Sequence, residues 1–136
     1  MIVVDTGVVV KLVLRSAESE AVARLFESEP LWVAPRLVRS EVMSVLSQVA
    51  PHARLGPATQ LVAFDVAMDA YHDASLEAEP QRVLELTSTS GCSSYDCEYV
   101  AIAQELGCRL ATYDRKVIRR FPGVASTPEA ILAGRA

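Results

Sequence analysis

The chain lacks the long apolar segment that a membrane-spanning helix requires. None of its hydrophobic runs approaches the roughly 20 residues that cross a bilayer, although 51% of its 136 residues are hydrophobic. The N-terminal run, residues 1–4, meets Asp5 at once and has no basic residue before it, so we expect no signal peptide. These absences predict a protein with no membrane partner.

Paired cysteines are also missing. The three cysteines are an odd number and contain no Cys-x-x-Cys pair, which argues against a disulfide framework and favours a reducing, cytoplasmic setting. We expect Cys92, Cys97 and Cys108 to be small buried or half-buried thiols without a metal. The only two histidines, His52 and His72, stand apart, so we expect them at the surface and find no Ser/His/Asp or Cys/His arrangement.

The sequence has no excess of positive charge. Its net charge is −4, which argues against broad, non-specific affinity for polyanions, because phosphate binding draws on a basic surface. A nucleic-acid substrate would then need bound cations or a few basic side chains. The candidates for phosphate contacts are Arg15, Arg36, Arg39, Lys116, Arg119 and Arg120, of which we expect one or two to serve.

Short apolar segments alternate with longer helical ones, which is typical of an α/β domain with a mostly parallel sheet. At this length we expect one domain, residues 1–136. Strands are predicted at 1–4, 31–34, 108–111 and 124–125, with 64–68 as a short edge strand or a link. Helices are predicted at 16–28, 35–49, 55–64, 67–78, 80–90, 93–106, 115–121 and from 127 onward, with 8–14 left open between a short helix and extended chain, and Pro51 as a helix terminator.

The clearest stretch is 93–114. Ser93 or Ser94 suits the N-cap of a helix, and Gly107 suits the left-handed position just past its end. Asp96 then lies in the first helical turn and Asp114 just beyond the strand that follows. Both acids are polar edges of an otherwise apolar unit.

Two further acids are expected at the same edge. Asp5 follows the first strand, and in parallel sheets ligands bind at the carboxyl ends of strands. Glu41 lies on the margin of the apolar stripe of its helix, which is formed by Val38, Val42, Val45 and Val49. Singly, each aspartate is explained as a helix cap or first-turn residue, and Glu41 as the partner of Arg36 or Arg39. Together, four carboxylates raise one another's pKa unless cations join them, and Mg²⁺ or Mn²⁺ would suit oxygen ligands.

The motifs Val3-Val4-Asp5-Thr6, Arg39-Ser40-Glu41-Val42, Tyr95-Asp96-x-x-Tyr99 and Leu110-x-Thr112-x-Asp114 resemble those of PIN domains. The group that they match most closely is the VapC-type toxins of toxin–antitoxin pairs. The resemblance implies a three-layer α/β/α sandwich around a mostly parallel sheet of four or five strands. It also implies that Asp5, Glu41, Asp96 and Asp114 are catalytic metal ligands, supported by Thr6 and Thr112. Gly7 departs from the family, in which Ser or Asn is common, and Glu98 is an extra acid that we expect in solvent.

What the resemblance implies about function is Mg²⁺- or Mn²⁺-dependent hydrolysis of RNA by a toxin held in check by a VapB-like antitoxin. Trp32 and the apolar helices leave room for a homodimer face and an antitoxin groove, although core packing explains them equally well. The alternative is a PIN-fold protein with a non-toxin RNA-processing role or a purely protein-binding role.

Two other protein classes fit less well. A haloacid-dehalogenase-like phosphatase needs a second Asp where this chain has Gly7. A receiver domain needs paired N-terminal acids, a mid-chain Asp and a late Lys in an order that this chain does not have.

Overall fold

Residues 1–134 are described by the computed structural model, which is built around one parallel sheet. Its five strands lie in the order β3-β2-β1-β4-β5, and every neighbouring pair is parallel. The predicted α/β sandwich is confirmed. The strands are β1 (Ile2–Val4), β2 (Trp32–Pro35), β3 (Tyr71–Leu76), β4 (Leu110–Ala111) and β5 (Ala125–Ser126).

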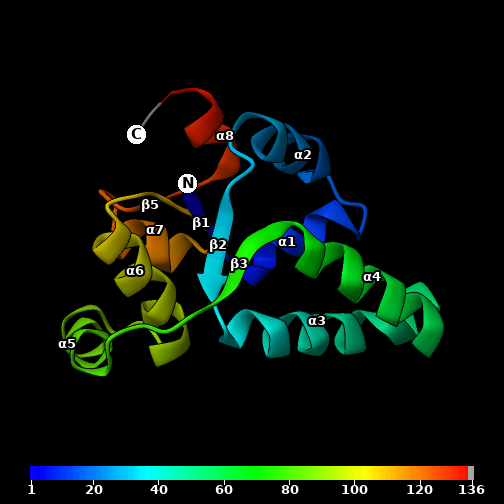
Figure 1. Cartoon of the computed structure of the whole chain (residues 1–136), viewed down its shortest axis with the longest axis horizontal. Helices are drawn as coiled ribbons and strands as arrows, with labels where there is room; N and C mark the ends of the chain where they lie inside the picture. The colour runs from blue at the N-terminus through cyan, green and yellow to red at the C-terminus, as the bar shows by residue number, and fades with distance from the viewer. Residues whose placement is uncertain (135–136) are drawn as a thin grey trace.

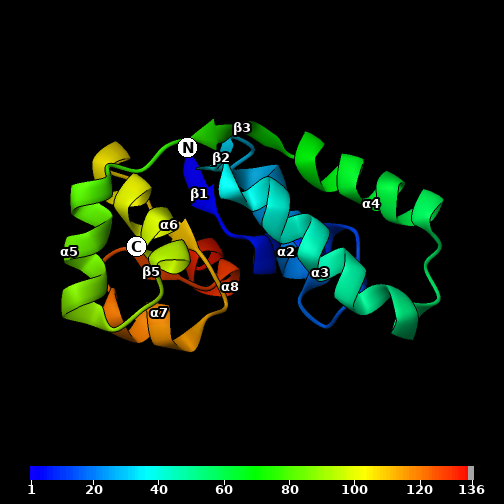
Figure 2. The same cartoon turned by 90° about the horizontal axis from the view of Figure 1, so that it is seen from below.

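Helices cover both faces of this sheet. α5, α6 and α7 lie on one side, and α2, α3 and α4 on the other (Figure 1). The α3–α4 hairpin extends away from the rest of the molecule (Figure 2), and α8 packs on α2 near the C-terminus. The helices are α1 (Thr6–Val9), the 3-10 turn η1 (Val10–Leu12), α2 (Ser19–Ser28), α3 (Leu37–Ala53), α4 (Pro57–Asp69), α5 (Pro80–Ser90), α6 (Ser94–Leu106), α7 (Arg115–Arg120) and α8 (Pro128–Leu132).

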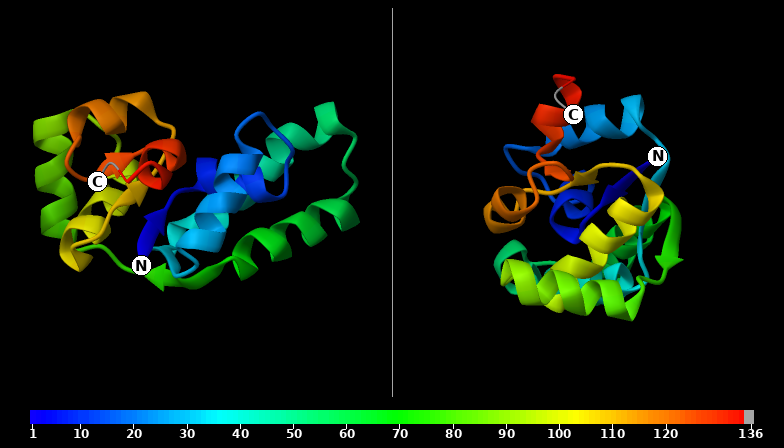
Figure 3. Two further views of the ribbon diagram at one scale, coloured as in Figure 1. Left: turned by 90° about the horizontal axis from the view of Figure 1, so that it is seen from above. Right: turned by 90° about the vertical axis from the view of Figure 1, so that its left-hand side faces the viewer.

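The hydrophobic core lies between the sheet and these two helical layers. Figure 3 shows the arrangement of the strands and helices from two further sides. β1 is buried along its whole length, as expected for a central parallel strand. Trp32 is fully buried and packs edge-on against Phe26 with ring centroids 5.0 Å apart, so it belongs to the core and not to a surface for a partner. Within residues 1–134, no helix is both long enough and apolar enough to cross a membrane.

The prediction for residues 64–78 was wrong. Residues 64–68 belong to α4, and the edge strand is β3, where a helix was expected. Alanines at 67, 70 and 74 favour helix locally, but β3 gains a parallel partner in β2. Tertiary pairing therefore overrode local propensity in this segment.

One smaller prediction needed correction, and one open segment is settled. Pro51 lies inside α3, which continues to Ala53 and ends at Arg54 in the left-handed conformation with φ of 55°. A proline in the last turn removes a single helical hydrogen bond, which this helix tolerates. The open segment 8–14 forms the end of α1 and then η1.

The carboxyl ends of β1 and β4 meet at the centre of the sheet. Val4 lies opposite Ala111 in the register of the two strands, and the Asp5 amide donates to the Ala111 carbonyl over 3.3 Å. The strand order reverses at β1, because β2 lies on one side of it and β4 on the other. The connection from β1 to β2 therefore covers one face of the sheet, and the connection that leads to β4 covers the other. Such a reversal of strand order opens a crevice at the carboxyl edge, and the predicted acids lie there.

Candidate functional site

Asp5 is the innermost carboxylate of this edge. It caps α1, because its Oδ1 accepts a hydrogen bond from the Val8 amide over 3.0 Å. Burial raises the pKa of Asp5 to about 7, with smaller upward contributions from Asp96 and Glu41, against hydrogen bonds from Thr112 and Val8 that lower it. Asp5 is therefore a helix cap, as its position in the sequence suggested. Burial and the neighbouring acids nevertheless disfavour the charged form of its carboxyl group.

Asp96 lies in the first turn of α6. Ser93 is the N-cap residue of that helix, and its hydroxyl accepts from the Asp96 amide over 3.1 Å. The Asp96 side chain is thus free of the capping role. Burial raises its pKa, the charge of Asp114 raises it further, and Ser93 and Lys116 lower it. The carboxyl group is half-buried, and it feels the negative charge of Asp114.

Asp114 has two local tasks. Its Oδ1 caps α7 by accepting from the amides of Lys116 and Val117 over 2.9 and 3.1 Å. The Thr112 hydroxyl oxygen in turn accepts from the Asp114 amide over 3.0 Å. Thr112 is buried, and its hydroxyl lies close enough to Asp5 to lower the pKa of that acid. One threonine therefore links the acids that follow β1 and β4.

Glu41 reaches the site from α3, the helix that follows β2. Its Oε1 accepts from the hydroxyls of Thr6 over 3.0 Å and Tyr99 over 2.6 Å. Burial, and then the Glu41 acceptor, raise the pKa of Tyr99, so its hydroxyl keeps its proton and remains a donor. Arg36 pairs instead with Glu77 at 3.0 Å, and Arg39 lies over the Phe64 ring, so neither arginine neutralises Glu41.

Two tyrosines belong to the site although the sequence analysis did not assign them to it. Tyr99 was named only as a member of the motif Tyr95-Asp96-x-x-Tyr99, without a role in the site, yet it holds Glu41. Its position three residues after Asp96, on the same helical face, was a usable signal. Tyr71 donates from β3 to the Val4 carbonyl over 2.8 Å, and burial, together with Asp5 and Glu41, raises its pKa; nothing in the sequence indicated this contact.

The four predicted acids thus lie at one edge and influence one another, but they are not drawn into a closed ligand set. Within residues 1–134, no group of three His, Cys, Asp or Glu side chains is arranged to hold a metal ion. In the same part of the chain, none of the four forms an ion pair with Lys or Arg. The edge is therefore a cluster of negative charge without a direct counter-charge.

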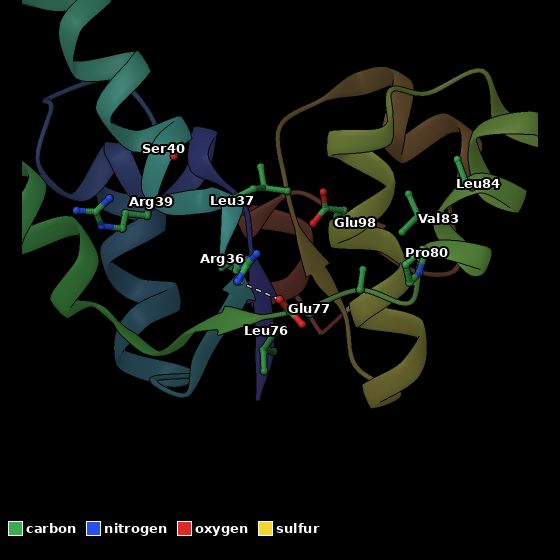
Figure 4. A pocket seen from close by; sticks show the side chains of 11 residues that line it. Arg36, Leu37, Arg39, Ser40, Leu76, Glu77, Pro80, Val83, Leu84 and Glu98 are labelled. Carbon is green, nitrogen blue, oxygen red and sulfur yellow. Dashed lines mark ion pairs between the residues drawn. The ribbon is translucent and has the colours of Figure 1, made fainter.

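A groove of about 800 Å³ lies beside Glu41, between the N-terminus of α3 and helices α5 and α6. Figure 4 shows Arg36 paired with Glu77 across one side and Glu98 directed toward Leu37. Burial and then Glu41 raise the pKa of Glu98, whereas Arg36 lowers it. Glu98 is half-buried and lines the groove, so its side chain is only partly in solvent. The lining residues are Arg36, Leu37, Arg39, Ser40, Leu76, Glu77, Ala78, Pro80, Val83, Leu84 and Glu98.

The remaining predicted positions behave more simply. A Cβ at Gly7 would lie 3.6 Å from Asp5 Oδ1, so a polar side chain there would touch this acid and the glycine omits that contact. His52 and His72 are exposed as predicted. Cys92, Cys97 and Cys108 are free thiols, the first two buried and the third half-buried.

The sequence profile of the PIN domain matches residues 2–124. The chain belongs to the PIN domain family. That match includes β1, α3, α6 and β4 with all four acids, so the site lies inside the part of the chain that defines the family.

Characterised relatives and one solved structure agree with this membership. This PIN domain is 33% identical over 121 residues to the VapC ribonuclease Mb0985 of Mycobacterium bovis and to the ribonuclease VapC9 of Mycobacterium tuberculosis, covering 86% of this chain and 88% of each relative. The crystal structure of PAE2754 from Pyrobaculum aerophilum superposes with a TM-score of 0.74, covering 98% of this chain and 88% of that one. At 18% identity, this likeness shows the fold alone.

Proposed function

We propose that this PIN domain is an endoribonuclease, and that it acts in the cytoplasm as the toxin of a toxin–antitoxin pair. The observation that carries the proposal is the meeting of Asp5, Glu41, Asp96 and Asp114 at one sheet edge without an ion pair within residues 1–134. The relatives named as VapC ribonucleases support the choice of RNA as substrate. We take residues 1–136 to act as one domain.

The same four carboxylates fit a divalent cation in their chemistry. All are hard oxygen donors, which suit Mg²⁺ or Mn²⁺. Burial, and to a smaller extent their mutual repulsion, raises the pKa of Asp5 and Asp96. Because these carboxylates do not form a ready-made ligand group within residues 1–134, we expect their side chains to move when the ion binds. Such an ion would supply activation of the attacking water and neutralisation of the leaving oxygen.

The chain's own residues prepare this edge for the ion and the RNA. Thr6 and Tyr99 both donate to Oε1 of Glu41, and their hydroxyls lie 3.1 Å apart, so one oxygen of the carboxylate is fixed and the other can bind the ion. The amides of α7 fix Asp114, and Thr112 joins Asp114 to Asp5. Supporting contacts of this kind orient ligands and raise metal affinity by roughly 10- to 100-fold.

Removal of divalent metal tests the reaction. We expect the purified protein to cleave a single-stranded RNA with Mg²⁺ or Mn²⁺, and to lose cleavage in EDTA by at least about 10²-fold, because the bound ion provides the reaction's charge stabilisation. Product analysis by denaturing gel measures the rate, and returning Mn²⁺ to the EDTA sample is the control. Equal cleavage in EDTA would refute the metal mechanism, and no cleavage with either ion would refute the enzyme.

We further propose that an antitoxin covers the acidic edge. The groove beside Glu41 adjoins that edge and combines the apolar side chains of Leu37 and Leu84 with charged ones, as a peptide-binding surface does. A basic antitoxin side chain among the carboxylates would take the place of the metal.

We also expect a homodimer. The alternative, a PIN protein with another RNA-processing role or a purely protein-binding role, needs no antitoxin.

Coexpression tests the toxin assignment. We expect expression of this chain alone to stop bacterial growth, and coexpression with a small DNA-binding reading frame from beside its gene to restore growth. Asp5→Asn is the control, because it should be harmless alone if the acids carry the toxicity. Growth unaffected by the wild-type chain, in cells shown by immunoblot to contain it, would favour the non-toxin role.

A further inference from the structure

Two of the basic side chains that lie near Glu41 already have a partner. Arg36 pairs with Glu77, and Arg39 lies over the Phe64 ring. A cation that is engaged in this way contributes little to binding a phosphate. Lys116 differs, because it lies next to two of the four acids and pairs with neither.

Hydrogen bonds hold both the backbone amide and the side-chain ammonium of Lys116. Its amide donates to Asp114 Oδ1 over 2.9 Å, and its Nζ donates to the Gly91 carbonyl over 2.7 Å. Gly91 ends α5 in the left-handed conformation with φ of 73°, two residues before the Ser93 cap of α6. The side chain therefore spans from α7 to the α5–α6 loop, and the ammonium is held beside the start of α6.

The contacts of this ammonium leave most of its binding capacity unused. An ammonium has three N–H donors, and Gly91, a neutral carbonyl, takes one of them. Within the part of the chain that the structure describes, no carboxylate lies within ion-pair distance of Lys116. The residue is exposed, yet its charge reaches Asp96 and lowers the pKa of that acid.

We propose that Lys116 binds a backbone phosphate of the RNA next to the one that is cleaved. The inference rests on the proposed ribonuclease function. An acidic protein with a net charge of −4 has no general electrostatic attraction for RNA, so binding requires a cation at the site itself. Lys116 is positioned to supply one beside Asp96 and Asp114, and the Gly91 carbonyl keeps it from collapsing onto either carboxylate.

The alternative is that Lys116 only ties α7 to the α5–α6 loop. A tether and a phosphate contact differ in the quantities that a substitution changes. Loss of a tether lowers thermal stability and does not depend on the RNA. Loss of one phosphate contact reduces the dependence of RNA affinity on salt, with a slope change near 0.7 in log Kd against log salt for a single strand.

The test uses Lys116→Met and Lys116→Arg in an Asp5→Asn background that does not cleave. Binding of a fluorescent single-stranded RNA is followed by anisotropy in EDTA between 50 and 200 mM salt. We expect Lys116→Met to raise Kd about 5- to 10-fold and to reduce the salt slope by about 0.7, and Lys116→Arg to restore most of both. With Asp5 intact, Lys116→Met should raise KM with kcat within about twofold.

Arg24→Met is the matched control, because it removes the same charge from α2 on the opposite side of the sheet. An unchanged salt slope in Lys116→Met, or an equal change in Arg24→Met, would overturn the assignment. So would a loss of thermal stability with Kd unchanged, which is the signature of a tether. If the parent chain neither binds nor cleaves RNA, the ribonuclease proposal fails as well, and this result is distinguishable from the others.

Discussion

Asp96→Asn is expected to lower the rate of RNA cleavage by on the order of 10²- to 10³-fold while leaving the fold intact. The effect is large because the change removes a negative oxygen at the point where the reaction needs charge stabilisation. The fold should survive because Ser93, not Asp96, caps α6, and Ser93 bonds to the Asp96 backbone amide, which the variant keeps. Cleavage rates at saturating Mg²⁺, together with circular dichroism, measure the two effects separately.

Asp114 extends this test, because its side chain has both a structural and a proposed catalytic task. Asparagine caps helices about as well as aspartate, whereas alanine costs roughly 1 kcal/mol. Asp114→Asn should therefore lose activity as Asp96→Asn does, with nearly wild-type stability. Asp114→Ala should lose activity equally, and α7 should also be destabilised, because the amides of Lys116 and Val117 lose their acceptor.

Glu105→Gln is the control for both variants, since it removes an exposed acid from the opposite end of α6. We expect its cleavage rate to stay within about threefold of wild type, as for most surface substitutions away from a site. A similar loss in Glu105→Gln would mean that net charge and not position matters. Full activity in Asp96→Asn would remove that acid from the proposed ligand set.

The elements that could be predicted from sequence are those whose signals are local. Ser93 and Gly107 mark the two ends of α6, and Pro80 lies in its predicted place in the first turn of α5. Each works through its own backbone neighbours. β3 could not be predicted in this way, because its strand conformation depends on pairing with β2. No residue within β3 indicates that pairing.

The residues of the site differ in the same way, since some have local sequence signals and others depend on long-range contacts. Asp5, Asp96 and Asp114 follow from their places at strand and helix ends. The environment of Glu41 does not, because Tyr99 lies 58 residues away in the chain and Thr6 lies 35 residues away. These contacts exist only once α3 and α6 meet across β1. Sequence reasoning could identify Glu41 as unusual on an apolar margin, but it could not name the hydroxyls that hold it.

Asp5→Asn is expected to make the metal-free protein more stable at pH 8, although it should abolish activity. The folded chain raises the pKa of Asp5 from 3.8 to about 7, chiefly by burial. Between these values the folded state holds a proton that the unfolded state releases. The free energy of unfolding therefore falls as pH rises through this window and is lowest above pH 7. At about 1.4 kcal/mol per pKa unit, the penalty reaches the order of 4 kcal/mol.

Asparagine is neutral at every pH and can still accept from the Val8 amide, so the variant should escape this penalty. In EDTA, we expect its stability advantage over wild type to grow by about 2 kcal/mol between pH 5.5 and pH 8. Urea unfolding followed by the fluorescence of Trp32, the single and fully buried tryptophan, measures the difference. Asp65→Asn, an exposed change on α4, reports the effect of net charge alone.

Divalent metal should reverse this order. An ion that binds the folded state and not the unfolded one stabilises it by an amount that grows with concentration, about 2.7 kcal/mol at 100 times Kd. Wild type should gain this stability in Mg²⁺ or Mn²⁺ at pH 8, and Asp5→Asn should gain much less, because it lacks one proposed ligand. Parallel pH profiles of the two proteins in EDTA would show that Asp5 is not held in a destabilising environment. Equal stabilisation by metal would show that Asp5 is not a ligand.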